Sequence, residues 1–154
     1  MKFKGVTNRS RTSLTKPNHD YLKYWRVIRY WVKAKYKLGT PELEMLLFLY
    51  SEQIFNKSQF KHYEELMSWD IKRFNYLLKE DWIHVWRKRK GNETTLYELT
   101  YKGKRVINTI YKKLNGEEIA ETSTNNPLFR FDASYMDKVY RNMIVEMNQE
   151  IKQQ

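Results

Sequence analysis

A short stretch near the middle of the chain carries side chains that can bind the edges of nucleic-acid bases. Arg73 is the residue type that pairs with guanine O6 and N7, and Asn75 is the type that pairs with adenine N6 and N7. Lys72 and Tyr76 flank this pair on its two sides and suit phosphate contacts, which position a protein without specifying a sequence. The spacing therefore predicts base reading flanked by backbone contacts.

A run of cations follows this stretch. It consists of Arg87, Lys88, Arg89 and Lys90. Runs of charge are usually solvated faces, but this one ends at the turn signal of residues 90–92. Segments 82–89 and 94–99 on its two sides are rich in β-branched and aromatic residues, which predicts a β-hairpin with a basic tip. Such a tip suits phosphate or minor-groove contact.

The base-reading side chains need a rigid element, and residues 68–80 read as one helix. Ser68 is its predicted N-cap, and Asp70 falls in the first turn, where the helix dipole favours negative charge. The predicted buried stripe is Ile71, Phe74, Leu77 and Leu78. The remaining face, together with the hairpin tip, forms the predicted DNA-binding surface. From the helix it includes Ser68, Trp69, Lys72, Arg73, Asn75 and Tyr76.

Four further helices are predicted around this unit. Residues 21–38 form the first, ending at Gly39, and Thr40 caps the second with Pro41 at its start. Residues 56–59 read as a capping box that opens a short third helix with Phe60, Tyr63 and Leu66 as core candidates. After the hairpin, Thr100 caps a helix that runs to about Leu114.

The C-terminal part departs from this pattern. Residues 115–132 contain a Ser/Thr/Asn cluster and Pro127, which predicts a linker that Leu128, Phe129 and Phe131 dock onto the body. Ser134 and Asp137 then open a last helix. Its predicted apolar stripe is Met136, Val139, Tyr140, Met143, Met147 and Ile151. The division is a basic arm at 1–18, a central domain at 19–114, the linker, and a terminal helix at 133–154.

The order helix, basic hairpin, helix is that of a winged helix-turn-helix, in which the second helix of the unit enters the major groove. Residues 99–103 resemble the Leu-Thr-x-x-Gly signature that closes the wing of MarR-type regulators. Residues 77–83 are similar to the step into that wing, and residues 40–47 to the start of the family's second helix. The resemblance covers roughly residues 20–114. Residues 87–89 lack the Asp of the usual Asp-x-Arg pair in the wing.

This resemblance implies a mainly α protein with a small β-hairpin, a winged helix-turn-helix with flanking N- and C-terminal helices. It implies sequence-specific binding of double-stranded DNA and transcriptional control by a homodimer. The first and last helices carry more apolar surface than one small domain can bury, which also favours dimerisation. A cleft lined by Tyr and Trp would suit a small aromatic effector, although a filled core is the commoner use of such residues.

Composition narrows the function classes further. The chain has a net charge of +11 and a sequence pI of about 9.7, values typical of a protein that meets a polyanion. It has no cysteine, which excludes disulfides and thiol chemistry and suits the cytoplasm. The sequence contains neither a membrane-length apolar run nor a secretory signal.

Enzyme chemistry finds little support in the sequence. The histidines, His19, His62 and His84, belong to three different predicted elements and lack metal-ligand spacing. The five glycines form no phosphate-binding loop. The prediction is therefore a protein without catalytic residues, metal or cofactor.

Two other readings stay open. Exposed aromatic rings could stack on the bases of single-stranded DNA or RNA, although most rings here fall on helical core stripes. A winged domain can also serve as a structural or assembly adaptor that binds protein rather than DNA, because fold does not determine function. The basic arm at 1–18 is read either as a free tail or as a phosphate-binding or minor-groove arm.

Overall fold

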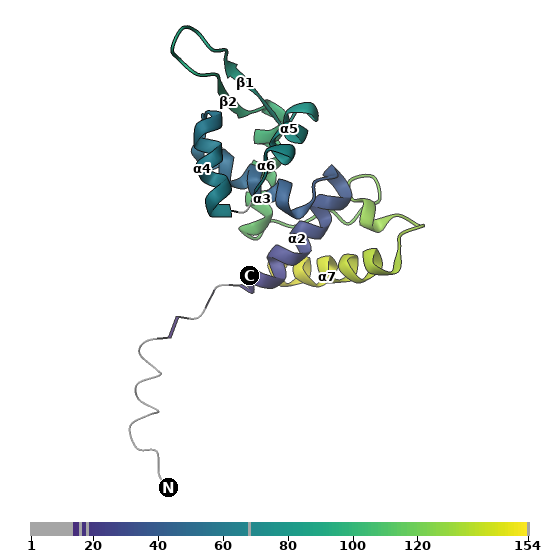
Figure 1. Ribbon diagram of the computed structural model, residues 1–154. Coiled ribbons are helices and arrows are strands. Elements are labelled where there is room, and N and C mark those ends of the chain that lie inside the picture. Colours follow the sequence, from purple (N-terminus) through teal and green to yellow (C-terminus); the bar gives the residue numbers. More distant parts are fainter. Residues whose placement is uncertain (1–13, 16, 18, 68, 154) are drawn as a thin grey trace, which may run out of the picture.

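The computed structural model describes residues 14–153 apart from 16, 18 and 68, so most of the predicted basic arm lies outside the described residues. Within them the chain forms six α-helices, one 3-10 turn and a two-stranded antiparallel hairpin (Figure 1). The helices are α2 (Tyr21–Tyr36), α3 (Thr40–Glu52), α4 (Lys57–Met67), α5 (Ile71–Lys79), α6 (Tyr101–Leu114) and α7 (Tyr135–Lys152). The strands are β1 (Ile83–Arg87) and β2 (Leu96–Leu99), and the 3-10 turn is η1 (Pro127–Phe129). The predicted class, mainly α with a small hairpin, is confirmed.

The hairpin is joined to the helices at its base and extends beyond them at its tip (Figure 1). Ile83 pairs with Leu99 and Val85 with Tyr97, and the register shifts between Val85 and Arg87. On the other side of β2, Phe55 exchanges two backbone hydrogen bonds with Tyr97, at 3.0 and 2.8 Å. The segment between α3 and α4 therefore adds one residue to the edge of the small sheet.

Aromatic rings fill the space between the hairpin and helices α3, α4 and α5. Phe74 of α5 packs against Phe60 of α4 at 4.7 Å and against Tyr97 of β2 at 5.2 Å, measured between ring centroids. Phe55, Phe60 and Phe74 are fully buried. Of the predicted stripe on α5, Phe74 and Leu77 are buried, but Ile71 is 41% exposed. The first turn of α5 therefore turns away from the core.

The helix ends agree with the sequence at three places. Asn56 and Gln59 exchange hydrogen bonds at 2.8 Å in the predicted capping box, and the Thr100 hydroxyl accepts from the Gly103 amide at 3.0 Å. Ser134 accepts from the Asp137 amide at 3.2 Å at the start of α7. Each side chain satisfies a backbone amide that has no partner inside its helix.

Three predicted helix boundaries are wrong. Helix α5 begins at Ile71, and Asp70 rather than Ser68 is its N-cap. Helix α2 ends at Tyr36, where Lys37 adopts a left-handed φ of 60°, so Gly39 does not terminate it. Gly39 is instead the N-cap of α3, and Thr40 is already the first residue of that helix. In each case the hydrogen bonds of the turn, rather than the nearest favourable residue type, set the boundary.

Residues 115–132 pack closely against α2 and α7. Ile119 and Leu128 are buried, and the buried Asn148 side chain of α7 bonds the backbone of Ile119 at both N (3.0 Å) and O (2.8 Å). Leu128 docks as predicted, but Phe131 is fully exposed. Leu66 of α4 and Met136 of α7, predicted as core, are also exposed, whereas Ile144 takes a core position that the predicted stripe omits.

Helices α2 and α7 pack against each other within one chain (Figure 1). The rings of Tyr30 and Tyr140 stack at 3.9 Å, and the Tyr30 hydroxyl donates to the Asp137 carboxylate at 2.7 Å. No helix in the described part of the chain has the length and apolar character needed to cross a membrane.

Candidate nucleic-acid interface

Helix α5 presents a polar face beside the base of the hairpin. Phe74 and Leu77 anchor it to the core, and this leaves Lys72, Asn75 and Tyr76 exposed. These three lie within one turn of each other, as expected for neighbours at helical spacing. The structure thus brings together a cation, an amide and a phenol on one accessible surface.

The Arg73 guanidinium is already held by two carboxylates of the protein. Its Nη1 lies 3.0 Å from the Asp70 carboxylate and its Nε lies 3.6 Å from the Glu42 carboxylate of α3. The Asp70 side chain also accepts from the Arg73 amide at 2.9 Å, so one carboxylate caps the helix and holds the guanidinium. Arg73 must give up or share these two carboxylates before it can donate a bidentate pair to a base.

Trp69 belongs to the core and not to the exposed surface. It is 7% exposed, and its ring packs edge-on against Phe48 of α3 at 5.3 Å and lies parallel to Phe60 of α4 at 6.3 Å. The predicted placement of Trp69 in the DNA-binding surface is therefore wrong, because its bulk fills the gap between α3 and α4. Ser68, predicted in the same surface, lies outside the described residues.

The cationic hairpin tip is formed as predicted. Arg87, Lys88, Arg89 and Lys90 are all exposed. Lys90 and Glu93 pair through their backbones, and Gly91 takes a φ of 59° in the turn between them. Arg87 lies 3.6 Å from the Glu93 carboxylate, whereas Lys88, Arg89 and Lys90 have no carboxylate within 4.0 Å in the part of the chain that the structure describes.

Sequence reasoning missed Trp86 as a surface residue. It lies on β1 at the register shift, is 50% exposed, and has the Arg87 guanidinium 6.0 Å from its ring centroid. Alternation along a half-buried strand would place every second residue outward, yet all of β1 after Ile83 is exposed. The hairpin therefore projects from the core, and an aromatic ring accompanies the cations of its tip.

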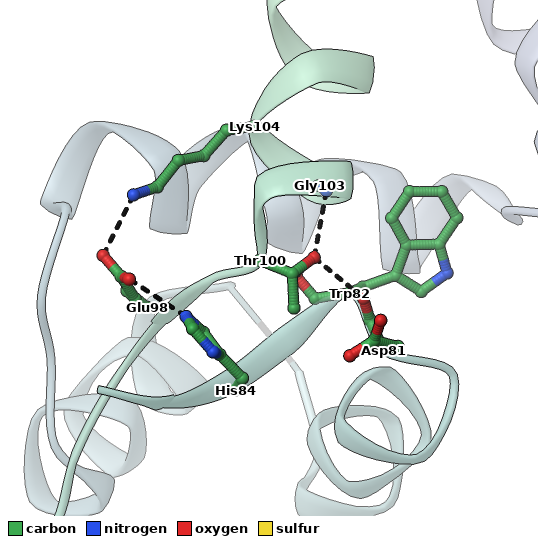
Figure 2. A network of polar contacts seen from close by, with 7 residues as sticks. All are labelled: Asp81, Trp82, His84, Glu98, Thr100, Gly103 and Lys104. Atoms are coloured by element: carbon green, nitrogen blue, oxygen red, sulfur yellow. Dashed lines mark hydrogen bonds and ion pairs between the residues drawn. The ribbon is translucent and has the colours of Figure 1, made fainter. Parts of the chain in front are cut away.

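Hydrogen bonds tie the base of the hairpin to α6 (Figure 2). The Thr100 hydroxyl donates to the Asp81 carbonyl at 2.8 Å, while Glu98 of β2 accepts from Lys104 of α6 at 3.0 Å. Glu98 also lies 2.9 Å from Nε2 of His84 across the hairpin. Burial alone would raise the pKa of Glu98, but the bonds from Lys104 and His84 hold that pKa below its ordinary value. These contacts fix the orientation of the hairpin relative to α6.

The turn that feeds the hairpin has a left-handed residue. Asp81 adopts a φ of 62°, a conformation in which glycine is favoured. The amides of Asp81 and Trp82 close the end of α5 by bonding the carbonyls of Leu78 (3.3 Å) and Leu77 (2.9 Å). Because α5 ends in this tight turn, its exposed face and the hairpin are held close in a fixed relation.

The positive charge of the protein is unevenly distributed. Residues 40–100, which contain α5 and the hairpin, carry nine Lys or Arg and ten Asp or Glu. Helices α2 and α6 together carry ten Lys or Arg and no carboxylate. Within the predicted DNA-binding unit, the cations are therefore concentrated at the tip and the rest is acidic.

Other kinds of site receive less support. No group of three His, Asp or Glu side chains suited to a metal ion occurs among the residues the structure describes. A groove of about 590 Å³ lies between α2, η1 and the start of α7. Tyr30 lines it together with charged residues such as Lys33, Lys37 and Arg130, so it differs from the predicted cleft lined by Tyr and Trp.

Comparison of the chain with protein-family models, with curated proteins and with solved structures found no match.

Proposed function

We propose that the protein is a winged helix-turn-helix DNA-binding protein, similar to MarR-type regulators, that controls transcription by binding a specific double-stranded sequence. The observation that carries this proposal is the basic tip of the hairpin joined through a tight turn to the polar face of α5. The hairpin tip contributes three cations without a carboxylate partner, and helix α5 contributes Lys72, Asn75 and Tyr76. Phosphate contact and base reading need these two kinds of surface side by side.

The order of elements supports the same class. Helices α3, α4 and α5 precede the hairpin, and Phe55 adds a bridge to β2 between α3 and α4. In a helix-turn-helix, here α4 and α5, the second helix lies in the major groove, while the hairpin of a winged domain contacts the backbone beside it. Accordingly, α5 is assigned to the bases and Arg87, Lys88, Arg89 and Lys90 to phosphates.

We propose further that two copies assemble through α2 and α7. Much of the apolar surface of these helices is used within the chain, but Tyr21 and Leu22 on α2 remain 60% and 66% exposed. Tyr135 and Met136 at the start of α7 are also exposed. A two-fold dimer would place two α5 helices about 34 Å apart, one turn of DNA. Sedimentation of a monomer at micromolar concentration, unchanged by duplex DNA, would contradict this assembly.

The test of DNA binding is a titration of a duplex selected from a random pool and of an unselected duplex, each at several salt concentrations. Arg89→Ala is expected to weaken both, and to flatten the slope of log K against log salt by about 0.9 for the lost phosphate contact. Asn75→Ala and Arg73→Ala are expected to cost roughly 1–3 kcal/mol on the selected duplex and much less on the other. Lys112→Ala, an exposed lysine at the far end of α6, is the matched control.

The outcomes separate readout from positioning. An equal loss of affinity for both duplexes after Arg73→Ala would have two explanations. Either Arg73 contacts phosphate, or removing its ion pairs with Asp70 and Glu42 alters the start of α5. Circular dichroism of the variant distinguishes these two. If neither Arg89→Ala nor Asn75→Ala changes either affinity, the winged unit does not bind DNA.

One observation favours a second candidate function, an adaptor that binds protein. The excess of carboxylates over cations in residues 40–100 is unusual for a surface that meets a polyanion. In that case the exposed Ile71 and Tyr76 of α5 would lie in a protein interface. Failure of both duplexes to bind, across salt, supports this candidate over the first.

We propose binding of a small aromatic effector only as a lower-ranked alternative, since half of the residues that line the groove beside Tyr30 are charged. Thermal melting against a panel of phenolic compounds tests it, and an unchanged melting temperature for every compound would remove the support.

A further inference from the structure

Helices α2 and α6 carry ten of the 29 Lys and Arg residues of the chain and pack against one another. Helix α2 and helix α6 each contain five Lys or Arg and no carboxylate. Of these ten cations, Lys23, Lys104 and Lys113 pair with carboxylates of other segments, and seven have none within 4.0 Å in the described part of the chain. So much unneutralised charge on two adjacent helices destabilises a compact state unless an anion meets it.

A groove of about 330 Å³ runs between the end of α2 and the start of α6. It is lined by Tyr36 of α2 and by Tyr101, Lys102, Arg105, Val106 and Thr109 of α6. The groove borders the end of α5, because Lys102 donates to the carbonyl of Glu80 at 2.8 Å. We call these six residues the α6 groove.

Cations and aromatic rings alternate around the α6 groove. The Arg105 guanidinium lies 5.7 Å from the ring centroid of Tyr101, and the Lys35 ammonium lies 5.5 Å from that of Tyr36. The Lys102 ammonium lies 4.1 Å from the ring centroid of Trp82, which directly precedes β1. Tyr101 is 76% exposed, so one face of its ring is free to stack.

We infer that the α6 groove is a second nucleic-acid site, which binds single-stranded DNA or RNA. Arg105 and Lys102 supply phosphate contacts, with Lys35 beside Tyr36 as a further cation, and the Tyr101 ring supplies a platform for a base. The bases of a duplex are already stacked on each other, so an exposed ring adds nothing to duplex binding. A single strand offers both a free base face and phosphates, and proteins bind it with this combination of rings and cations.

The inference is independent of the proposed role of α5 and the hairpin tip. The experiment uses the full chain with labelled single strands of DNA and of RNA of about 15 nucleotides, a length that covers a typical site, and the matching duplex. Fluorescence anisotropy is recorded for the wild type, Tyr101→Ala, Tyr101→Phe, Arg105→Ala, Trp86→Ala and Arg89→Ala. The DNA and RNA arms show which sugar the site accepts.

Tyr101→Ala is expected to weaken single-strand binding about 5- to 150-fold, the range for loss of one stacked base. Tyr101→Phe should bind as the wild type does, because it keeps the ring. Arg105→Ala should flatten the salt slope for the single strand by about 0.7. None of the three should change duplex affinity, whereas Arg89→Ala should change duplex affinity alone.

Three results would overturn the inference. The first is single-strand binding that Tyr101→Ala leaves unchanged. The second is loss on Trp86→Ala instead, which would assign the strand to the hairpin. The third is displacement of the single strand by polyglutamate, provided that Tyr101→Ala weakens polyglutamate binding as much as it weakens single-strand binding. This result would identify an acidic protein segment as the occupant. Unchanged duplex binding in the Arg89→Ala arm would count against the proposed function alone, so the two failures are distinguishable.

Discussion

Residues 40–100 and the pair of helices α2 and α6 differ in their balance of cations and carboxylates. The first region contains nearly balanced charges, with its cations gathered at the hairpin tip and Arg73 held between two carboxylates. The second contains ten cations and no carboxylate. The difference teaches that a strongly basic chain need not be basic in the region where its sequence predicts DNA contact.

The two regions also differ in how they are packed. The first rests on a cluster of aromatic rings, whereas α2 of the second region is joined to α7 by the stacked pair Tyr30 and Tyr140 and by the hydrogen bond from Tyr30 to Asp137. They meet where α6 leaves the hairpin, at Gly103, Thr100 and Lys104 (Figure 2). Substitutions in each packing cluster and at this junction therefore test whether the molecule behaves as one unit or two.

The largest effect is expected from Phe74→Ala. Phe74 is fully buried against Phe55, Phe60 and Tyr97, so its removal should lower the free energy of unfolding by about 3–5 kcal/mol. Ile71→Ala on the same helix is the control and should cost less than about 1 kcal/mol, since Ile71 is 41% exposed. The measurement is urea unfolding followed by circular dichroism and by tryptophan fluorescence.

Coincident transitions of the two probes would show that both regions unfold together. A variant whose two probes give transitions at different urea concentrations would divide the protein into two units. A loss for Ile71→Ala as large as for Phe74→Ala would contradict the placement of α5.

Gly103→Ala tests the junction itself. An added Cβ would lie 2.7 Å from the carbonyl oxygen of Trp82, a backbone atom at the base of the hairpin. Alanine favours a helix over glycine by about 1 kcal/mol, but the overlap should cost more and leave a net loss of about 1–3 kcal/mol. Asn108→Ala, exposed on the same helix, isolates the propensity gain. A melting temperature that rises in both variants would show that α6 is free to move from the hairpin.

Much of the fold follows from sequence patterns that local physics determines. The hairpin, the capping box at Asn56 and the N-caps Thr100 and Ser134 were predicted because turn and cap chemistry acts over a few residues. Trp69 could not be placed, since a bulky aromatic at a helix start suits either surface or core until α3 and α4 are positioned. The pairing of Arg73 with Glu42 and the groove between α2 and α6 depend on tertiary neighbours in the same way.

A smaller effect is expected at the α2–α7 contact. Tyr30→Phe removes the hydrogen bond to Asp137 and should cost about 1 kcal/mol, measured by urea unfolding at neutral pH. Burial, followed by the bond to Asp137, raises the pKa of Tyr30 from 10.0 to about 12. Because the folded state favours the protonated phenol, this stability is full below pH 10.0 and is lost as the pH rises toward 12. Tyr140→Phe keeps the ring stack and should retain that alkaline loss; a Tyr30→Phe profile identical to the wild type would exclude Tyr30 as its source.

The smallest effect is expected at Glu98, the carboxylate that links the hairpin to α6. Its side chain is 18% exposed while those of His84 and Lys104 are about half exposed, so Glu98→Gln should cost no more than about 1 kcal/mol at neutral pH. The pKa of Glu98 is lowered in the folded state, because the bonds from Lys104 and His84 outweigh the opposing effect of burial. The stability it contributes is therefore present above the ordinary carboxyl value of 4.5 and is lost as the pH falls through the lower folded value. Unfolding midpoints measured through this acid range should decline less steeply in Glu98→Gln than in the wild type. Glu93→Gln, whose partner Arg87 lies 3.6 Å away at the exposed tip, should follow the wild-type decline. Equal declines in all three proteins would show that the Glu98 contacts do not couple the two regions.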